Sequence, residues 1–143
     1  FQGSRGLGDV YKRQTLGTIV IIMSLWGMTH GDEWAEIGWG EGNVLAHDEA
    51  YEEMWALHLM PLGVMAIITA LIVTGKELAK IAMFAPIVLV NMLGGMLILT
   101  RDNGYGGTPT GVSAALAGLM MLATILTCAS GFMHKGDTEE SGD

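Results

Sequence analysis

Four apolar blocks dominate this sequence and limit the folds that it can adopt. They cover residues 15–29, 54–74, 81–99 and 112–133. A helix needs roughly 20 residues to cross a bilayer, so the last three blocks are long enough to span a membrane and the first is short. Half of all residues are hydrophobic and only 15% are charged, which is too apolar for a typical soluble domain. The sequence therefore predicts an all-α integral membrane protein, folded as an antiparallel bundle of four transmembrane helices.

The first fourteen residues differ in character from the rest of the chain. The string DVYKRQ at residues 9–14 resembles the translation of a common sequencing adapter, and FQGS at residues 1–4 resembles the remnant of a cleaved tag. We therefore expect residues 1–14 to be non-native and the natural protein to begin with residues that precede position 15. Residues 15–134 are predicted to form the transmembrane domain, and residues 135–143 a disordered acidic tail.

The charged residues of the connections indicate how the helices are oriented in a cell membrane. Lys76, Lys80 and Lys135 flank the apolar blocks at one end, whereas the connection 30–53 holds eight acids and neither lysine nor arginine. Basic residues are enriched in cytoplasmic loops. Both termini are therefore predicted to be cytoplasmic and the acidic first loop to lie outside. The net charge of −8 also argues against nucleic acid as a partner.

The second block is predicted to continue a helix that begins in water. Asn43 is a favourable N-cap for a helix starting at Val44, which would carry both His47 and His58. Eleven steps of 1.5 Å separate these two histidines by about 16 Å along the axis, so they cannot bind the same ion. Because the connection 75–80 is short, the second and third blocks are expected to pack antiparallel.

Three histidines fall on the outer side of this topology, among carboxylates. Imidazole suits zinc and copper(II), so a metal site is predicted from His58, His30, His47, Glu52 and Glu49. A compact site would need His58 with His30, or His47 with a nearby glutamate. On this hypothesis the protein binds or conducts a cation, a transition metal or a proton, through an acidic outer mouth. Alternatively, these side chains are solvated or hydrogen-bonded to neighbouring helices.

The third block contains polar and sulfur-bearing side chains that could continue such a path. The amide of Asn91 lies near the middle of the block, where it is expected to seek a partner on another helix. Met92 and Met96 lie one turn apart, and thioethers suit copper(I). Methionine is equally an ordinary core residue, so helix packing is the alternative interpretation.

Two further functions are compatible with the sequence. The fourth block has a face of small residues, which is typical of close helix packing in lipid and of a non-catalytic accessory or scaffolding subunit, in a homo-oligomer or a larger membrane complex. These residues are Ser113, Ala117, Thr124, Cys128 and Gly131. A small haem-binding electron carrier would instead need His58 and His30 to face each other. No arrangement typical of an enzyme is found, and the adjacent Glu52 and Glu53 point about 100° apart on a helix.

Overall fold

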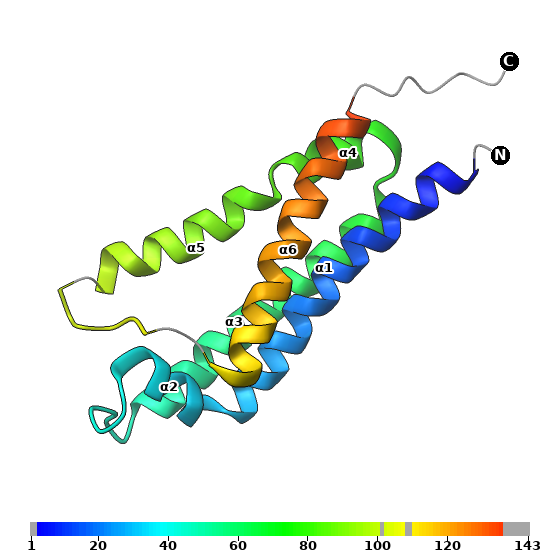
Figure 1. Ribbon diagram of the computed structural model, residues 1–143. Helices are drawn as coiled ribbons and strands as arrows, with labels where there is room; N and C mark the ends of the chain where they lie inside the picture. Colours follow the sequence, from blue (N-terminus) through cyan, green and yellow to red (C-terminus); the bar gives the residue numbers. More distant parts are fainter. Residues whose placement is uncertain (1–2, 101, 108–109, 136–143) are drawn as a thin grey trace, which may run out of the picture.

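The computed structural model of this chain is all-helical, as predicted. It describes residues 3–100, 102–107 and 110–135, and the predicted acidic tail from residue 136 onward lies outside them. The described residues form no strand and six helices (Figure 1). These are α1 (Gly3–Thr29), α2 (Gly31–Trp39), α3 (Asp48–Ile72), α4 (Gly75–Met83), α5 (Ala85–Thr100) and α6 (Gly111–His134). Residues 3–14, predicted to be non-native, continue α1 toward the N-terminus, and their origin stays a prediction.

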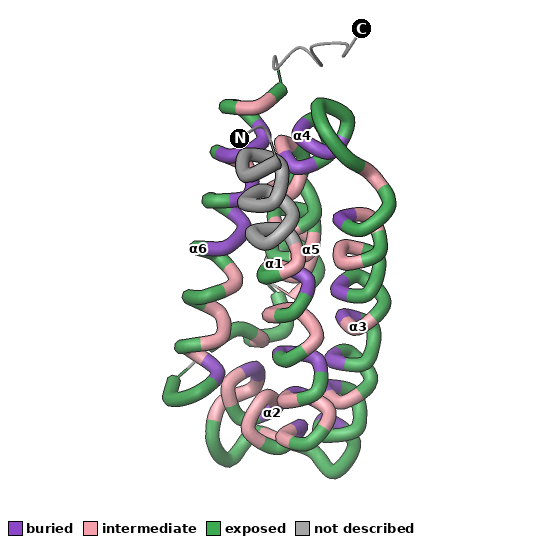
Figure 2. Tube along the Cα trace, turned by 90° about the vertical axis from the view of Figure 1, so that its right-hand side faces the viewer, coloured by how far each residue is buried: buried purple, intermediate pink, exposed green. Residues whose placement is uncertain are grey.

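Three helical segments are long and apolar enough to cross a membrane. They are Asp48–Ile72, Gly75–Thr100 and Gly111–His134, the second being α4 and α5 in succession. The apolar part of α1, Gln14–Thr29, is shorter, as the sequence indicates. Figure 2 shows buried residues on the sides of α1, α3 and α6 that face one another, and exposed residues on their outer sides. The exposed residues include many leucines, isoleucines and valines, which is the pattern expected of helices in lipid.

The most extensive helix pair is α1 with α3. Gly17 and Gly63 lie at the crossing, and a Cβ added to either one would come within 2.8 Å of the carbonyl oxygen of the other. Nearby, the buried Ser24 donates from Oγ to the carbonyl of Ala56 at 2.8 Å. Small residues let the two backbones approach, and the hydroxyl of Ser24 is satisfied across the interface.

Helix α6 packs on α1 and α4 through part of its small-residue face (Figure 1). A Cβ on Gly131 would lie 2.6 Å from the carbonyl oxygen of Ala79 and 2.7 Å from the nitrogen of Met83. Cys128 Sγ lies 3.5 Å from the carbonyl oxygen of Met83. The predicted role of these small residues in packing is therefore confirmed at the end of α6 that faces α4.

Helix α5 departs from the expected packing. The helix breaks at Phe84, because Pro86 has no N–H to donate to the carbonyl of Ala82. Beyond the break, α5 diverges from the other helices (Figure 1) and contacts α6 more than α3. The expectation that the second and third apolar blocks pack along each other is therefore wrong. A cavity lies between them instead.

The acidic connection also differs from expectation at the start of α3. The helix begins at Asp48, four residues later than predicted, so His47 precedes it. Asn43 does not cap it, since its Nδ2 donates to the carbonyl of Trp39 at the end of α2, at 3.3 Å. The backbone N–H of Leu45 donates to Asp48 Oδ2 at 2.7 Å, so Asp48 holds the turn that enters the helix.

Candidate functional site

The predicted ligand His30 lies at the junction of α1 and α2, packed against its own helix. Its ring stacks on the ring of Trp26, with centroids 3.6 Å apart and planes 10° from parallel. Nδ1 lies 3.1 Å from the carbonyl oxygen of Trp26 and 2.9 Å from Thr29 Oγ1. These contacts fix the ring by local interactions at the end of α1.

His58 and His47 are held by residues of their own segments as well. His58 is exposed on α3, with Nδ1 2.5 Å from the carbonyl oxygen of Met54 one turn earlier. His47 is exposed too, with Nε2 3.5 Å from Asp48 Oδ1 and its ring edge-on to Tyr51 at 5.2 Å. Neither imidazole contacts a residue of another helix in the hydrogen bonds and ring contacts of the described chain.

The predicted glutamates differ from each other in environment. Glu52 is 6% exposed and accepts a hydrogen bond from the hydroxyl of Tyr105 at 2.6 Å. Glu49 is exposed, and its backbone carbonyl lies against Gly31 where α2 crosses α3. A third acid, Glu33 of α2, accepts from Ser113 Oγ of α6 at 2.7 Å. Two of these three carboxylates thus join separate segments at the acidic end of the molecule.

The predicted metal ligands are not gathered at one point. Within the residues that the structure describes, no group of three or more histidine, cysteine, aspartate or glutamate side chains is placed to hold one ion. His58, His30, His47, Glu52 and Glu49 instead make the separate contacts given above. Binding of copper, zinc or haem at this end therefore stays a prediction that no geometry of the described residues favours.

A structural clamp at the acidic end was missed by sequence reasoning. Tyr105 donates to Glu52 and packs edge-on against Trp39, with ring centroids 4.9 Å apart. The N–H of Gly106 donates to the carbonyl of Gly38 at 2.7 Å, and Gly38 lies so close to the Tyr105 ring that no side chain fits there. Burial, followed by the bond to Glu52, raises the pKa of Tyr105. We call these five residues the tyrosine clamp, since they tie the connection after α5 to α2 and α3.

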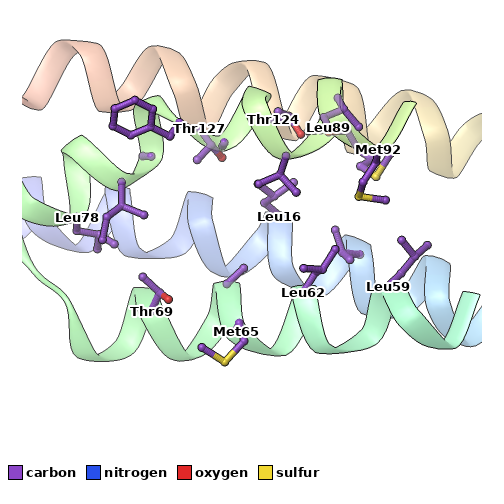
Figure 3. A pocket seen from close by; sticks show the side chains of 18 residues that line it. Leu16, Leu59, Leu62, Met65, Thr69, Leu78, Leu89, Met92, Thr124 and Thr127 are labelled. Carbon is purple, nitrogen blue, oxygen red and sulfur yellow. Dashed lines mark hydrogen bonds between the residues drawn. The ribbon is translucent and has the colours of Figure 1, made fainter. Parts of the chain in front are cut away.

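A cavity of about 350 Å³ lies between α1, α3, α4, α5 and α6. Figure 3 shows α6 on one side of it and α3 on the opposite side. Its volume lies at the lower end of the range of about 300–1,000 Å³ typical of small-molecule sites. The lining is Leu16, Val20, Leu59, Leu62, Met65, Ala66, Thr69, Leu78, Ile81, Ala82, Phe84, Ala85, Val88, Leu89, Met92, Met120, Thr124 and Thr127.

Three threonines supply the polar atoms of the cavity side chains. Thr124 Oγ1 donates to the carbonyl of Met120 at 2.8 Å, one turn earlier on α6. Thr127 is 3% exposed, and its Oγ1 is buried without a hydrogen-bond partner among the described residues. Thr69 lies on the opposite wall, from α3 (Figure 3). A buried hydroxyl without a partner costs about 1–3 kcal/mol, so Thr127 marks a point at which a bound polar atom would be favourable.

The predicted path residues of α5 do not all line the cavity. Met92 lines the cavity, Asn91 beside it is exposed, and Met96 is half-buried outside the cavity lining. Adjacent residues on a helix point about 100° apart, which explains the separation of Asn91 from Met92. The three side chains therefore do not form one continuous path.

Comparison of the chain with protein families, with curated proteins and with solved structures finds no match. Function must therefore be inferred from the arrangement of the residues themselves.

Proposed function

We propose that this chain is a non-catalytic subunit of a membrane assembly and that α5 is the helix that joins it to its partner. The observation that carries the proposal is Asn91, an exposed amide in an otherwise apolar stretch of α5, without a hydrogen-bond partner among the described residues. Side-chain amides in lipid commonly pair between helices, with a gain of about 1 kcal/mol. Asn91 has no such pairing among the described residues, so a partner helix would supply it.

Asn91 belongs to a stripe of residues with the spacing of a helix interface. Ile87, Asn91, Gly94 and Ile98 follow one another at intervals of four, three and four, and fall within about 60° of one another around the helix. Ile87 is 59% exposed, Ile98 is 71% exposed, and a Cβ on Gly94 would meet nothing within 4 Å. This stripe, the α5 seam, is centred about 140° from the residues of α5 that line the cavity. Alternating steps of four and three are typical of left-handed helix pairs.

The occupant that best fits the α5 seam is a second copy of the chain. An amide both donates and accepts, so two Asn91 side chains that meet across a two-fold axis satisfy each other. Gly94, one turn further on, leaves room for the two backbones to approach. A single polar residue at a seam position also fixes register, because any shift leaves both amides unpaired.

The same proposal includes the membrane topology. Four segments cross the bilayer, namely α1, α3, α4 with α5, and α6, and both termini are cytoplasmic. The basic residues Lys76, Lys80 and Lys135 at one end support this orientation, as does the acidic connection at the other. In a Cys128→Ala background, Glu41→Cys should react with an impermeant maleimide added to intact cells, whereas Glu77→Cys should react only after lysis. The reverse pattern would overturn the orientation.

Oxidative cross-linking in native membranes tests the seam. Ile98→Cys, in the Cys128→Ala background, should form a disulfide dimer when copper phenanthroline is added. Val90→Cys is the matched control, because Val90 is 69% exposed on the same helix but lies about 80° from Ile98. It should give little or no dimer.

Three other outcomes would contradict parts of the proposal. Equal cross-linking of the two variants would show that α5 collides without a preferred face, which contradicts the seam. A cross-link from Ile98→Cys to a different polypeptide would overturn the second copy and identify a heteromeric complex. A single-chain mass at every protein concentration in mild detergent, with no cross-link in membranes, would overturn the assembly altogether.

A further inference from the structure

The cavity between α3, α5 and α6 has one end built of apolar side chains alone. Leu59, Leu62 and Met92 lie at this end, from α3 and α5 (Figure 3). None of them offers a hydrogen bond to a ligand beyond the weak acceptor of a thioether. This end fits an aliphatic or prenyl tail, whose burial is favourable in proportion to the area that it covers.

The end toward α4 has a different chemistry. Thr127 and Thr69 lie there, with Leu78 of α4 between them in Figure 3. Thr127 Oγ1 is buried without a partner among the described residues. The backbone carbonyl of Thr69 accepts from the N–H of Val73, but its hydroxyl makes no hydrogen bond within that same part of the chain. Thr124 offers the contrast, because its hydroxyl already donates to Met120. Two hydroxyls free to donate are suited to carbonyl oxygen on a ligand.

The charge of the lining decides which carbonyl compound fits. Among the residues that the structure describes, no charged side chain lines the cavity. Lys80 of α4, the helix nearest the hydroxyls, is paired with Glu77 at 2.8 Å and exposed at the surface. A phosphate or carboxylate entering the cavity would lose its hydration without meeting a cation, which is costly. The occupant is therefore neutral.

We propose that this cavity binds a neutral, membrane-dissolved molecule that has a long apolar tail and a carbonyl-bearing head of the quinone type. The head lies against Thr127 and Thr69, and the tail runs toward Leu59 and Met92. The inference goes beyond a role in assembly, because the α5 seam faces away from the cavity and either property can hold without the other.

Photolabelling of the full chain in phosphatidylcholine vesicles tests the site. The probe is an azido-ubiquinone with a ten-carbon tail, and decylubiquinone is the competitor. Labelled peptides should come from the middle of α3 and from α6 around Thr124 and Thr127. Ala66→Phe, which fills the cavity from α3, should abolish the labelling that decylubiquinone competes, and Met65→Trp serves the same purpose if the first variant fails to fold.

A matched pair of threonine variants tests the head group. Thr127→Val removes a free hydroxyl and should raise the half-maximal concentration of decylubiquinone about fivefold, as expected for one lost neutral hydrogen bond. Thr124→Val removes a hydroxyl that is already satisfied and should leave that concentration unchanged. Asn91→Leu should also leave it unchanged, so a failure of the seam is distinguished from a failure of this site.

Three results would overturn the inference. Competed labelling that survives both cavity-filling variants would place the probe elsewhere. Equal effects of Thr127→Val and Thr124→Val would remove the proposed hydrogen bond. Competition by oleate or phosphatidylglycerol as effective as that by decylubiquinone would show that the site takes acidic lipids rather than a neutral head.

Discussion

The pair α1–α3 and the helix α5 represent two opposite ways in which a helix can sit in a membrane protein. Along α1 and α3, glycines meet at the crossing and the buried hydroxyl of Ser24 bonds across the interface. Along α5, Gly94 meets nothing and the amide of Asn91 is left exposed. Glycine and polar residues thus form contacts within the chain at the α1–α3 crossing, whereas the same residue types of α5 have no such contacts among the described residues. Small and polar residues in an apolar helix therefore predict that it packs on another helix, but they do not indicate whether that helix belongs to the same chain or to a partner.

The largest effect is expected from filling the α1–α3 crossing. Gly63→Val places methyl groups against the carbonyl of Gly17 and the side chain of Ile21, where a Cβ alone already lies within 2.8 Å. Overpacking of this kind costs about 1–3 kcal/mol or more, so the variant should lose most of its folded yield or melt well below the wild type.

The matched control is the equivalent change on the open helix. A Cβ on Gly94 would meet no atom of the other described residues within 4 Å. Gly94→Val should therefore leave the stability of the monomer unchanged, while it blocks close approach of a second α5. Thermal melting in detergent and dimer cross-linking report the two effects separately. If both valines destabilise the monomer alike, the proposed difference between the two regions is wrong.

The second effect concerns the tyrosine clamp, which holds the connection that follows the C-terminal end of α5. Tyr105→Phe removes a hydrogen bond to the buried carboxylate of Glu52. Bonds to charged groups contribute about 1.5–3 kcal/mol, so the connection 102–107 should become accessible to protease. Limited proteolysis of the purified protein measures this, with Tyr51→Phe, at an exposed tyrosine on α3, as the control. Equal cleavage of both variants would show that the clamp does not hold this connection.

A smaller effect is expected at the seam. Asn91→Leu removes a reciprocal amide pair and should weaken the dimer about tenfold, which corresponds to about 1.4 kcal/mol. Sedimentation or single-molecule photobleaching in vesicles over a range of protein-to-lipid ratios gives the dissociation constant. Asn91→Gln, which keeps an amide, should restore part of the affinity. A dimer that Asn91→Leu strengthens would indicate packing without the hydrogen bond.

The smallest change is expected at the acidic end when metal is offered. Because the described side chains gather no three ligands, protein purified without a histidine tag should carry much less than one zinc or copper per chain. His58→Ala should then leave the metal content unchanged. Stoichiometric metal that is lost in His58→Ala would instead support the cation-binding hypothesis and require a rearrangement of the acidic end. Elemental analysis by mass spectrometry decides between these outcomes.

Hydropathy alone was enough to predict the helical class and the three long spans, since each rests on a continuous block of residues. The path of α5 could not be predicted, because Pro86 indicates a break but not the direction that the chain takes beyond it. The start of α3 was misplaced because both Asn43 and Asp48 can hold a helix entrance, and only the surrounding turn decides between them.

The candidate sites were harder to predict because they depend on pairings across the chain. Thr124 and Thr127 are the same residue type three positions apart on one helix, yet one hydroxyl is satisfied and the other is not. The bond between Tyr105 and Glu52 joins residues separated by 53 positions, and nothing near either residue specifies the other. The local sequence indicates which polar groups need hydrogen-bond partners, but only the fold determines which residues those partners are.

The break at Phe84 divides one long apolar segment into α4, which packs on α6, and α5, which makes few contacts with the other helices. Helix α4 is anchored to α6 at Gly131, and the connection beyond α5 is anchored at Tyr105. Helix α5, between these two anchors, makes few contacts with the other helices. Helix α5 is therefore held mainly at its two ends. The width of the opening between α3 and α5 is consequently set by the two anchors, so a change at the Tyr105 contact can alter the volume of the cavity between these helices.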